Sequence, residues 1–139
     1  MVRMWRMSTS ASLSHRVTNR ELDRARLLAK VRGREVTLSS VCDATPPLIG
    51  SAEVLGEPEE RPCPVCHHRT LRLTRWIHSI WLGEKSGTAR NVREIQKVLE
   101  DFSADHADGR PGELSIHTVE VCLRCKWNFL IRYEDFIAG

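Results

Sequence analysis

The chain has 139 residues, of which 41% are hydrophobic and 28% are charged, so it can form one domain or a small domain with an appended module. No apolar run approaches the ~18 residues that a membrane span needs, and no signal segment opens the chain, which favours a soluble, cytoplasmic protein. The formal net charge of +3 is uneven, because residues 1–34 carry +7 and the remainder carries −4. This asymmetry favours nucleic acid or an acidic protein as a partner, and a solvated basic helix face is the simpler alternative.

Residues 1–16 are rich in Ser, Thr and Met and have no periodic apolar pattern. We therefore expect a disordered tail, with the start codon at Met1, Met4 or Met7. Trp5 is expected to be exposed in that tail, and its arginine neighbours leave stacking on a base as an alternative.

Residues 17–56 predict a module of three short helices. Thr18-Asn19-Arg20-Glu21 matches a capping box, which predicts the start of the first helix. Leu22 and Leu28 belong to its expected apolar stripe, and Gly33 is suited to end it in the left-handed conformation.

Two shorter helices complete this module. Thr37 precedes the second helix, in which Cys42 is expected to be a small buried residue. Thr45-Pro46-Pro47 is a typical start for the third helix, and Gly56 ends it. This third helix contains no Arg or Lys, which argues against a helix-turn-helix DNA reader.

The segment 57–62 is polar and contains two prolines, so it is predicted to be the linker to a second domain, residues 63–139. Runs rich in β-branched and aromatic residues predict strands over 71–81, 114–121 and 127–133. The predicted fold class is therefore α+β, with the N-terminal short-helix module followed by an antiparallel ribbon. Two CxxC pairs, Cys63/Cys66 and Cys122/Cys125, predict that this is a zinc ribbon.

One amphipathic helix, over about 91–102, is predicted to be inserted in this ribbon and to pack its apolar stripe on the sheet. Two loops flank it. Residues 83–88 contain Gly, Lys, Ser and Thr but lack the GxxxxGK[ST] order of a phosphate loop. Residues 101–113 are expected to be a solvated acidic loop, with a second metal site as the less favoured alternative.

Two CxxC clips, Cys63-Pro64-Val65-Cys66 and Cys122-Leu123-Arg124-Cys125, carry the clearest chemistry. Four thiolates in two such clips are typical ligands of one tetrahedral Zn²⁺, and the closed ligand set indicates a structural ion. The 55 residues between the clips exceed the compact spacing, so a folded insertion must fill the gap. A redox dithiol in the first clip is one alternative, and a ligand from His67 or His68 is another.

The sequence shows no pattern typical of an enzyme. Four histidines lie on different predicted elements without a nucleophile–base motif: His15, His78, His106 and His117. We predict instead a non-catalytic zinc-binding protein, without a small-molecule substrate, that docks on a protein or nucleic acid of the transcription or translation machinery. The residues predicted to contact the partner are basic: Arg20, Arg24, Lys30, Arg124 and Lys126. Direct RNA or DNA binding through the N-terminal helix and a thiol–zinc redox sensor are the alternatives.

Four motifs occur together in this chain: Val41-Cys42-Asp43-Ala44, Cys63-Pro64-Val65-Cys66, Ser86-Gly87-Thr88-Ala89-Arg90 and the run from Val119 to Asn128. In this combination the chain resembles an uncharacterised actinobacterial family of unknown function with a zinc-ribbon frame. The resemblance covers about residues 17–139. It implies a cytoplasmic bacterial protein and implies little about activity.

Overall fold

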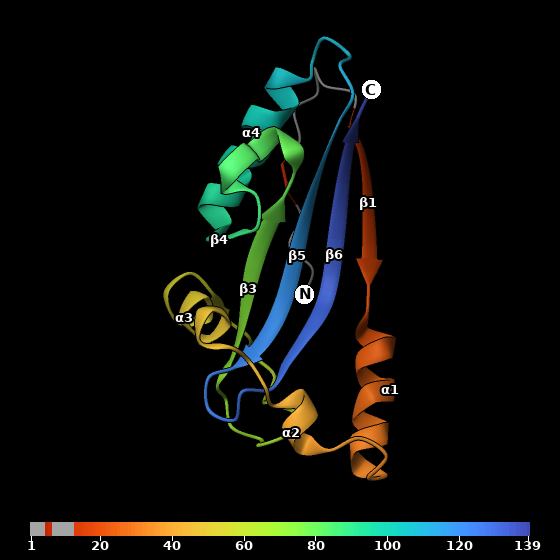
Figure 1. Ribbon diagram of the computed structural model, residues 1–139, viewed down its shortest axis with the longest axis vertical. Coiled ribbons are helices and arrows are strands. Elements are labelled where there is room, and N and C mark those ends of the chain that lie inside the picture. The colour runs from red at the N-terminus through yellow and green to blue at the C-terminus, as the bar shows by residue number, and fades with distance from the viewer. Residues whose placement is uncertain (1–4, 7–12) are drawn as a thin grey trace.

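The structure is a computed structural model that describes residues 5–6 and 13–139. Its described residues form one antiparallel sheet with the strand order β1-β6-β5-β3-β2, and β4 pairs with β3 (Figure 1). The strands are β1 (Leu13–Asn19), β2 (Glu57–Pro58), β3 (Leu71–His78), β4 (Thr88–Arg90), β5 (Gly112–Cys122) and β6 (Asn128–Ala138). The helices are α1 (Glu21–Arg32), α2 (Leu38–Val41), α3 (Pro46–Val54), the 3₁₀ helix η1 (Ile80–Lys85) and α4 (Val92–Asp105).

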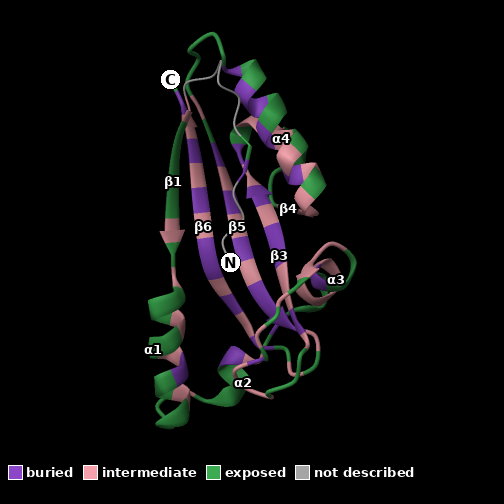
Figure 2. Ribbon diagram, turned by 180° about the vertical axis from the view of Figure 1, so that it is seen from behind, coloured by how far each residue is buried: buried purple, intermediate pink, exposed green. Residues whose placement is uncertain are grey.

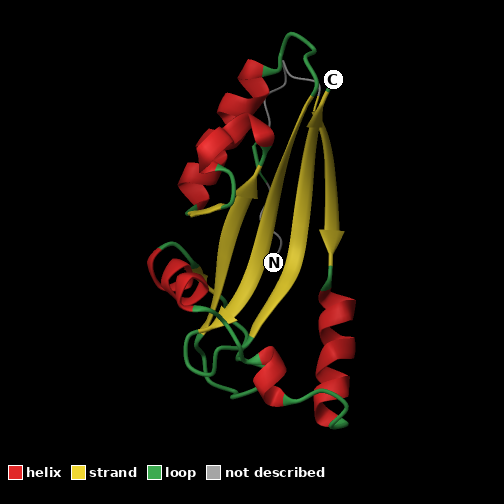
Figure 3. Cartoon of the chain, in the orientation of Figure 1, coloured by secondary structure: helices red, strands yellow, loops and turns green. Residues whose placement is uncertain are grey.

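The helices gather at the two ends of this sheet (Figure 3). Helix α4 and turn η1 lie at one end, and α1, α2 and α3 lie at the other. This mixture of helices and antiparallel strands confirms the predicted α+β class. No helix in the described ranges is long and apolar enough to cross a membrane.

The hairpin of β5 and β6 is the longest pairing in the sheet and confirms the two C-terminal strands predicted. Its register joins Gly112 to Ala138 at one end and Val121 to Asn128 at the other, with a bulge between Thr118 and Val119. Alternate residues of a strand point to opposite faces, and the hairpin accordingly alternates between buried and partly buried positions (Figure 2). The turn of this hairpin carries the second CxxC clip.

Helix α4 begins as the sequence predicts and packs its apolar stripe on the sheet. Asn91 Oδ1 accepts from Glu94 N at 2.8 Å, and Glu94 Oε1 accepts from Asn91 N at 3.1 Å, which completes a capping box. The stripe and its sheet partners form one buried cluster: Ile77, Ile95, Leu99, Phe102, Ile116 and Phe136. The helix runs on to Asp105, three residues beyond its predicted end at 102. The first five residues of the loop predicted over 101–113 are therefore helical.

The N-terminal segment differs from its prediction. Residues 13–16 are not disordered, because they belong to β1, which pairs with β6. Strand β1 lies at the sheet edge and is mostly exposed, so its polar sequence shows no apolar alternation. Trp5 is 7% exposed, and its Nε1 donates to Glu134 Oε1 at 3.3 Å, so the prediction of an exposed aromatic is wrong. The rest of the predicted tail, residues 1–4 and 7–12, lies outside the described residues.

Helix α1 begins two residues later than the capping box predicts, because its N-cap is Arg20 and not Thr18. Thr18 lies in β1 instead, and Asn19 Oδ1 accepts from Glu21 N at 2.8 Å. Leu28 is the buried residue of the helix, whereas Leu22 is 62% exposed, so the predicted stripe is wrong at Leu22. The left-handed residue after the helix is Arg34, with φ 61°, and not Gly33.

The remaining elements agree with the sequence except at two boundaries. Helix α3 begins after Thr45, whose Oγ1 accepts from Leu48 N at 3.4 Å, as predicted. The predicted linker begins instead as β2, which pairs with β3 and adds its residues to the sheet. Strand β3 ends at His78 and not near residue 81, because Ser79 Oγ accepts from Trp81 N at 3.2 Å and starts η1.

Candidate metal centre

The first clip forms a tight turn just before β3. Val65 N donates to Cys63 Sγ at 3.4 Å. Around it, Cys63 O accepts from His67 N at 3.0 Å, and Cys63 N donates to His68 O at 2.9 Å. His67 has a left-handed backbone with φ 63°, which lets the chain turn back after Cys66.

The second clip repeats this turn between β5 and β6. Arg124 N donates to Cys122 Sγ at 3.4 Å. Cys122 O accepts from Lys126 N at 3.1 Å, and Cys122 N donates to Trp127 O at 2.8 Å. Lys126 takes the same left-handed conformation as His67, with φ 70°. The two clips are therefore copies of one backbone motif.

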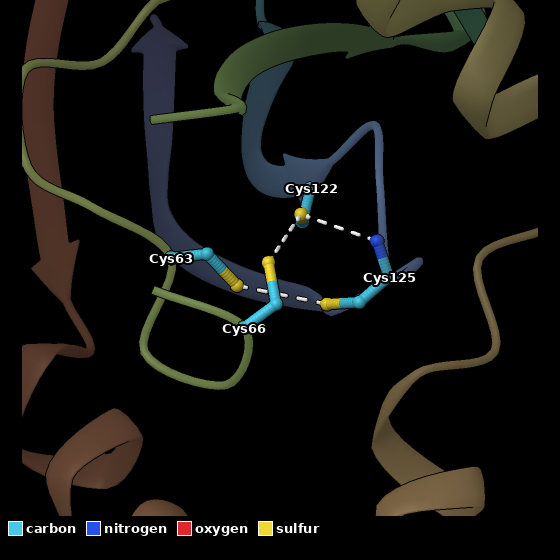
Figure 4. A group of neighbouring side chains, drawn as sticks. All are labelled: Cys63, Cys66, Cys122 and Cys125. Atoms are coloured by element: carbon cyan, nitrogen blue, oxygen red, sulfur yellow. Dashed lines mark hydrogen bonds between the residues drawn. The ribbon is translucent and has the colours of Figure 1, made fainter. Parts of the chain in front are cut away.

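The two turns bring four sulfur atoms together (Figure 4). Cys63 Sγ lies 3.6 Å from Cys125 Sγ, and Cys66 Sγ lies 3.6 Å from Cys122 Sγ. All four sulfurs lie within 4.8 Å of one another. A tetrahedral metal with bonds of about 2.3 Å separates its sulfur ligands by roughly 3.8 Å, so this donor set fits one metal ion.

Hydrogen bonds to sulfur prepare one thiol of the cluster to ionise. Burial acts to raise the pKa of Cys122, but bonds from Cys125 N, the Thr70 hydroxyl and Arg124 N outweigh it and lower that pKa to about 7. Thr70 Oγ1 lies 3.0 Å from Cys122 Sγ. Burial dominates at Cys63 and raises its pKa to about 11. Because a metal binds thiolates, Cys122 is the thiol best prepared to receive one.

A buried carboxylate lies on β5, just before the second clip. Glu120 is fully buried and accepts from Trp127 Nε1 at 2.8 Å, from Arg24 Nε at 2.9 Å and from Arg61 Nη2 at 2.9 Å. Glu59 joins this cluster through an ion pair with Arg61. The cluster joins α1, the segment before β3 and the β5–β6 hairpin. Sequence reasoning missed it, since no local pattern links residues 24, 61 and 120.

Cys42, the fifth cysteine, lies at the end of α2 and packs beside the metal cluster. It is half-buried and not fully buried as expected. Burial raises the pKa of Cys42, and a hydrogen bond with Cys125 opposes that rise. Its sulfur is not among the four that meet within metal-binding distance.

The five basic residues predicted to contact a partner lie in two kinds of environment. Arg24 is held in the buried cluster of Glu120. Arg20 Nε pairs with Asp23 at 3.2 Å, and its guanidinium lies 4.8 Å from the centre of the Phe129 ring. The remaining three are exposed: Lys30, Arg124 and Lys126. Their role in binding stays a prediction.

Aromatic residues near the clips are part of the hydrophobic core. Trp127 is fully buried and lies parallel to Phe129, with 6.1 Å between the ring centres.

Two of the scattered histidines, His78 and His117, lie side by side on the sheet, with ring centres 4.4 Å apart. Burial and the neighbouring His78 lower the pKa of His117.

The chain is similar in sequence to a family of proteins and to several of its members. A model of a family of unknown function, DUF5318, matches residues 12–139. The chain belongs to the DUF5318 family. Proteins similar to this DUF5318 member include the uncharacterized protein Mb0050 of Mycobacterium bovis and the uncharacterized protein Rv0049 of Mycobacterium tuberculosis. Each is 37% identical over 118 residues, which cover 85% of this chain and 78% of the relative.

These findings confirm the resemblance to an uncharacterised bacterial family, and the family match begins at residue 12 rather than at 17. No solved structure matches the chain. The metal-binding geometry of this DUF5318 protein therefore rests on its own four cysteines.

Proposed function

We propose that the four cysteines bind one structural Zn²⁺ ion and that the protein is a non-catalytic, cytoplasmic docking protein built on a zinc ribbon. The observation that carries this proposal is the meeting of four sulfurs from two copies of one turn. A four-thiolate tetrahedral site suits zinc or an iron–sulfur centre, and two matched CxxC turns are typical of the zinc ribbon. Four protein ligands leave no open coordination position, which favours a structural role over catalysis.

The place of the site supports a structural role. The second clip connects β5 to β6, and the first clip lies far from it in sequence, in the segment before β3. Leu71 and Trp127 are buried in the cluster that contains the two buried ligands, Cys63 and Cys122. A metal ion there would hold the end of the sheet on which α1 and α2 also pack (Figure 1).

The partner of this docking protein is proposed to be an acidic protein or a nucleic acid of the transcription or translation machinery. Three exposed basic residues support this choice: Lys30, Arg124 and Lys126. They lie on α1 and on the second clip, at the same end of the sheet (Figure 1). Charges at such a surface attract a polyanion over long range.

A salt titration of binding tests the docking proposal. The triple variant Lys30→Gln, Arg124→Gln, Lys126→Gln should keep zinc and fold but bind single-stranded RNA or duplex DNA more weakly. Each lost phosphate contact should lower the slope of log affinity against log salt by about 0.7 to 0.9. Weak but equal binding by wild type and variant, with equal slopes, would rule out this surface for nucleic acid. Affinity capture from nuclease-treated lysate then tests a protein partner.

The redox-sensor alternative is supported by one arrangement, the packing of Cys42 and Cys125 against the same core cluster. Oxidation by peroxide would join these two sulfurs as a disulfide, reduce the peroxide to water and remove one metal ligand. We expect the closed site to resist mild peroxide. Reversible zinc release that disappears in Cys42→Ser would instead establish the sensor.

A further inference from the structure

A cleft of about 430 Å³ lies between helix α4 and the turn that leads from β3 into β4. Apolar side chains that include Ile77, Trp81 and Val98 line part of it. The rest of the lining is charged, with four basic and two acidic side chains: Lys85, Arg90, Arg93, Lys97, Glu94 and Asp101. A cleft of this size with an apolar wall and a few convergent polar groups is typical of small-molecule sites.

The positive charge of this cleft is only partly neutralised. Arg90 Nη1 lies 3.5 Å from Glu94 Oε2, and Lys97 Nζ lies 2.9 Å from Asp101 Oδ1. In the part of the chain that the structure describes, Lys85 and Arg93 form no ion pair. Two cations therefore remain to bind an anion beside an apolar wall.

The indole of Trp81 lines the cleft and is held in place by two contacts. Its Nε1 donates to Asp105 Oδ2 at 2.7 Å, and its ring meets the ring of Phe102 edge-on, with 5.2 Å between centres. The indole is half-buried, so one part of its surface is available to a ligand. A rigid indole of this kind stacks on flat aromatic rings.

The turn that carries Lys85 is also held in place. Gly83 and Gly87 have left-handed backbones, with φ of 59° and 78°, which favour glycine. Gly87 N donates to Ile77 O at 2.7 Å and ties the turn to β3. The segment lacks the order of a phosphate loop, yet the fold brings its lysine to the same cleft that Arg93 of α4 lines.

We propose that this cleft binds a small phosphorylated molecule with an aromatic ring, of the mononucleotide class. Lys85 and Arg93 bind the phosphate, since ammonium and guanidinium groups form charge-assisted hydrogen bonds with phosphate oxygens. Trp81 contacts the ring. This site uses neither the metal centre nor the basic surface at the far end of the sheet, so it goes beyond the proposed function.

Nuclear magnetic resonance titration of the zinc-loaded full chain tests this proposal. Adenosine monophosphate should shift the indole N–H resonance of Trp81, and the shift should saturate. Adenosine has only the aromatic ring and inorganic phosphate only the anion, so each should bind more weakly. The double variant Lys85→Gln, Arg93→Gln should weaken the monophosphate by at least about tenfold, because two charged hydrogen bonds are lost. The matched control Arg32→Gln, an exposed arginine at the end of α1, should bind like wild type.

Four outcomes would overturn the proposal. The first is an unmoved Trp81 resonance at millimolar monophosphate. The second is equal affinity of the double variant and wild type for the monophosphate. The third is adenosine binding as tightly as its monophosphate. The fourth is binding of single-stranded RNA by Lys85 and Arg93 without binding of the mononucleotide, which would make the cleft part of a macromolecular surface.

Discussion

Arg24 and Glu120 form a buried ion pair that ties helix α1 to the sheet directly behind the second clip. Arg24 Nε lies 2.9 Å from Glu120 Oε1, and the two side chains are 11% and 0% exposed. The α1 surface is therefore not uniformly solvated, because one of its arginines helps to neutralise a carboxylate in the core.

Replacement of Arg24 by Gln should destabilise the protein. Removing one partner of a buried ion pair leaves the other charge uncompensated and costs about 3–5 kcal/mol, with Arg61 remaining near Glu120 to reduce that cost. Urea unfolding of the zinc-loaded protein measures the change. Lys30→Gln on the same helix is the control and should change the free energy of unfolding little. Equal stability of the two variants would contradict the role of the pair.

Glu59 should make stability depend on pH. Burial, the hydrogen bond to Glu120 and repulsion by Glu120 raise the pKa of Glu59 from 4.5 to about 7, against the opposing effect of Arg61. Between these two values the folded state binds more protons than the unfolded state, so the free energy of unfolding should fall as pH rises. Burial acts to raise the pKa of Glu120, but the hydrogen bonds that it accepts outweigh burial and lower that pKa. The stabilising contribution of Glu120 to folding is therefore lost only at more acidic pH.

The variant Glu59→Gln should remove this dependence. The difference in free energy of unfolding, variant minus wild type, should rise by on the order of 1–2 kcal/mol as pH rises from about 5 to about 7. Urea unfolding across that range, with the metal-loaded forms compared at each pH, measures the difference. Glu60→Gln, an exposed neighbour, is the control. A constant difference between Glu59→Gln and wild type would show that Glu59 does not titrate in this window.

The left-handed residues after each clip should affect metal affinity. Lys126 has φ 70°, a conformation that costs a residue with a side chain roughly 1–2 kcal/mol relative to glycine. Lys126→Gly should therefore keep or strengthen metal binding, and Lys126→Val should weaken it. Competition with a chromophoric chelator measures the affinity. Arg124→Val, which removes the same charge from a residue outside the left-handed region, should weaken binding less than Lys126→Val does.

The sequence predicts best the features whose signals are local. Helix α4 follows from its capping box and apolar stripe, and α3 follows from Thr45 and two prolines. The four-cysteine cluster follows from the spacing of two CxxC clips, each of which makes its own turn. Each of these signals is contained in one short stretch of the chain.

The sequence fails where long-range contacts decide the structure. Strand β1 is polar and exposed, and it forms because β6 offers a free edge across more than 100 residues. Trp5 is buried in the core cluster that includes Ile95 and Phe102, and it bonds Glu134, which no nearby residue signals. The sequence predicts that Arg24 contacts a partner and gives no sign of its ion pair, because Glu120 lies 96 positions away.

The metal content of the purified protein is the most direct test of the account. Native mass spectrometry of the chain purified without added metal should show one zinc per chain. The variant Cys122→Ser should lose the metal and melt at a much lower temperature by circular dichroism, because structural zinc contributes directly to folding. Cys42→Ser, which removes a neighbouring thiol outside the cluster, should keep both. A metal-free wild type whose melting is unchanged in Cys122→Ser would contradict the central claim.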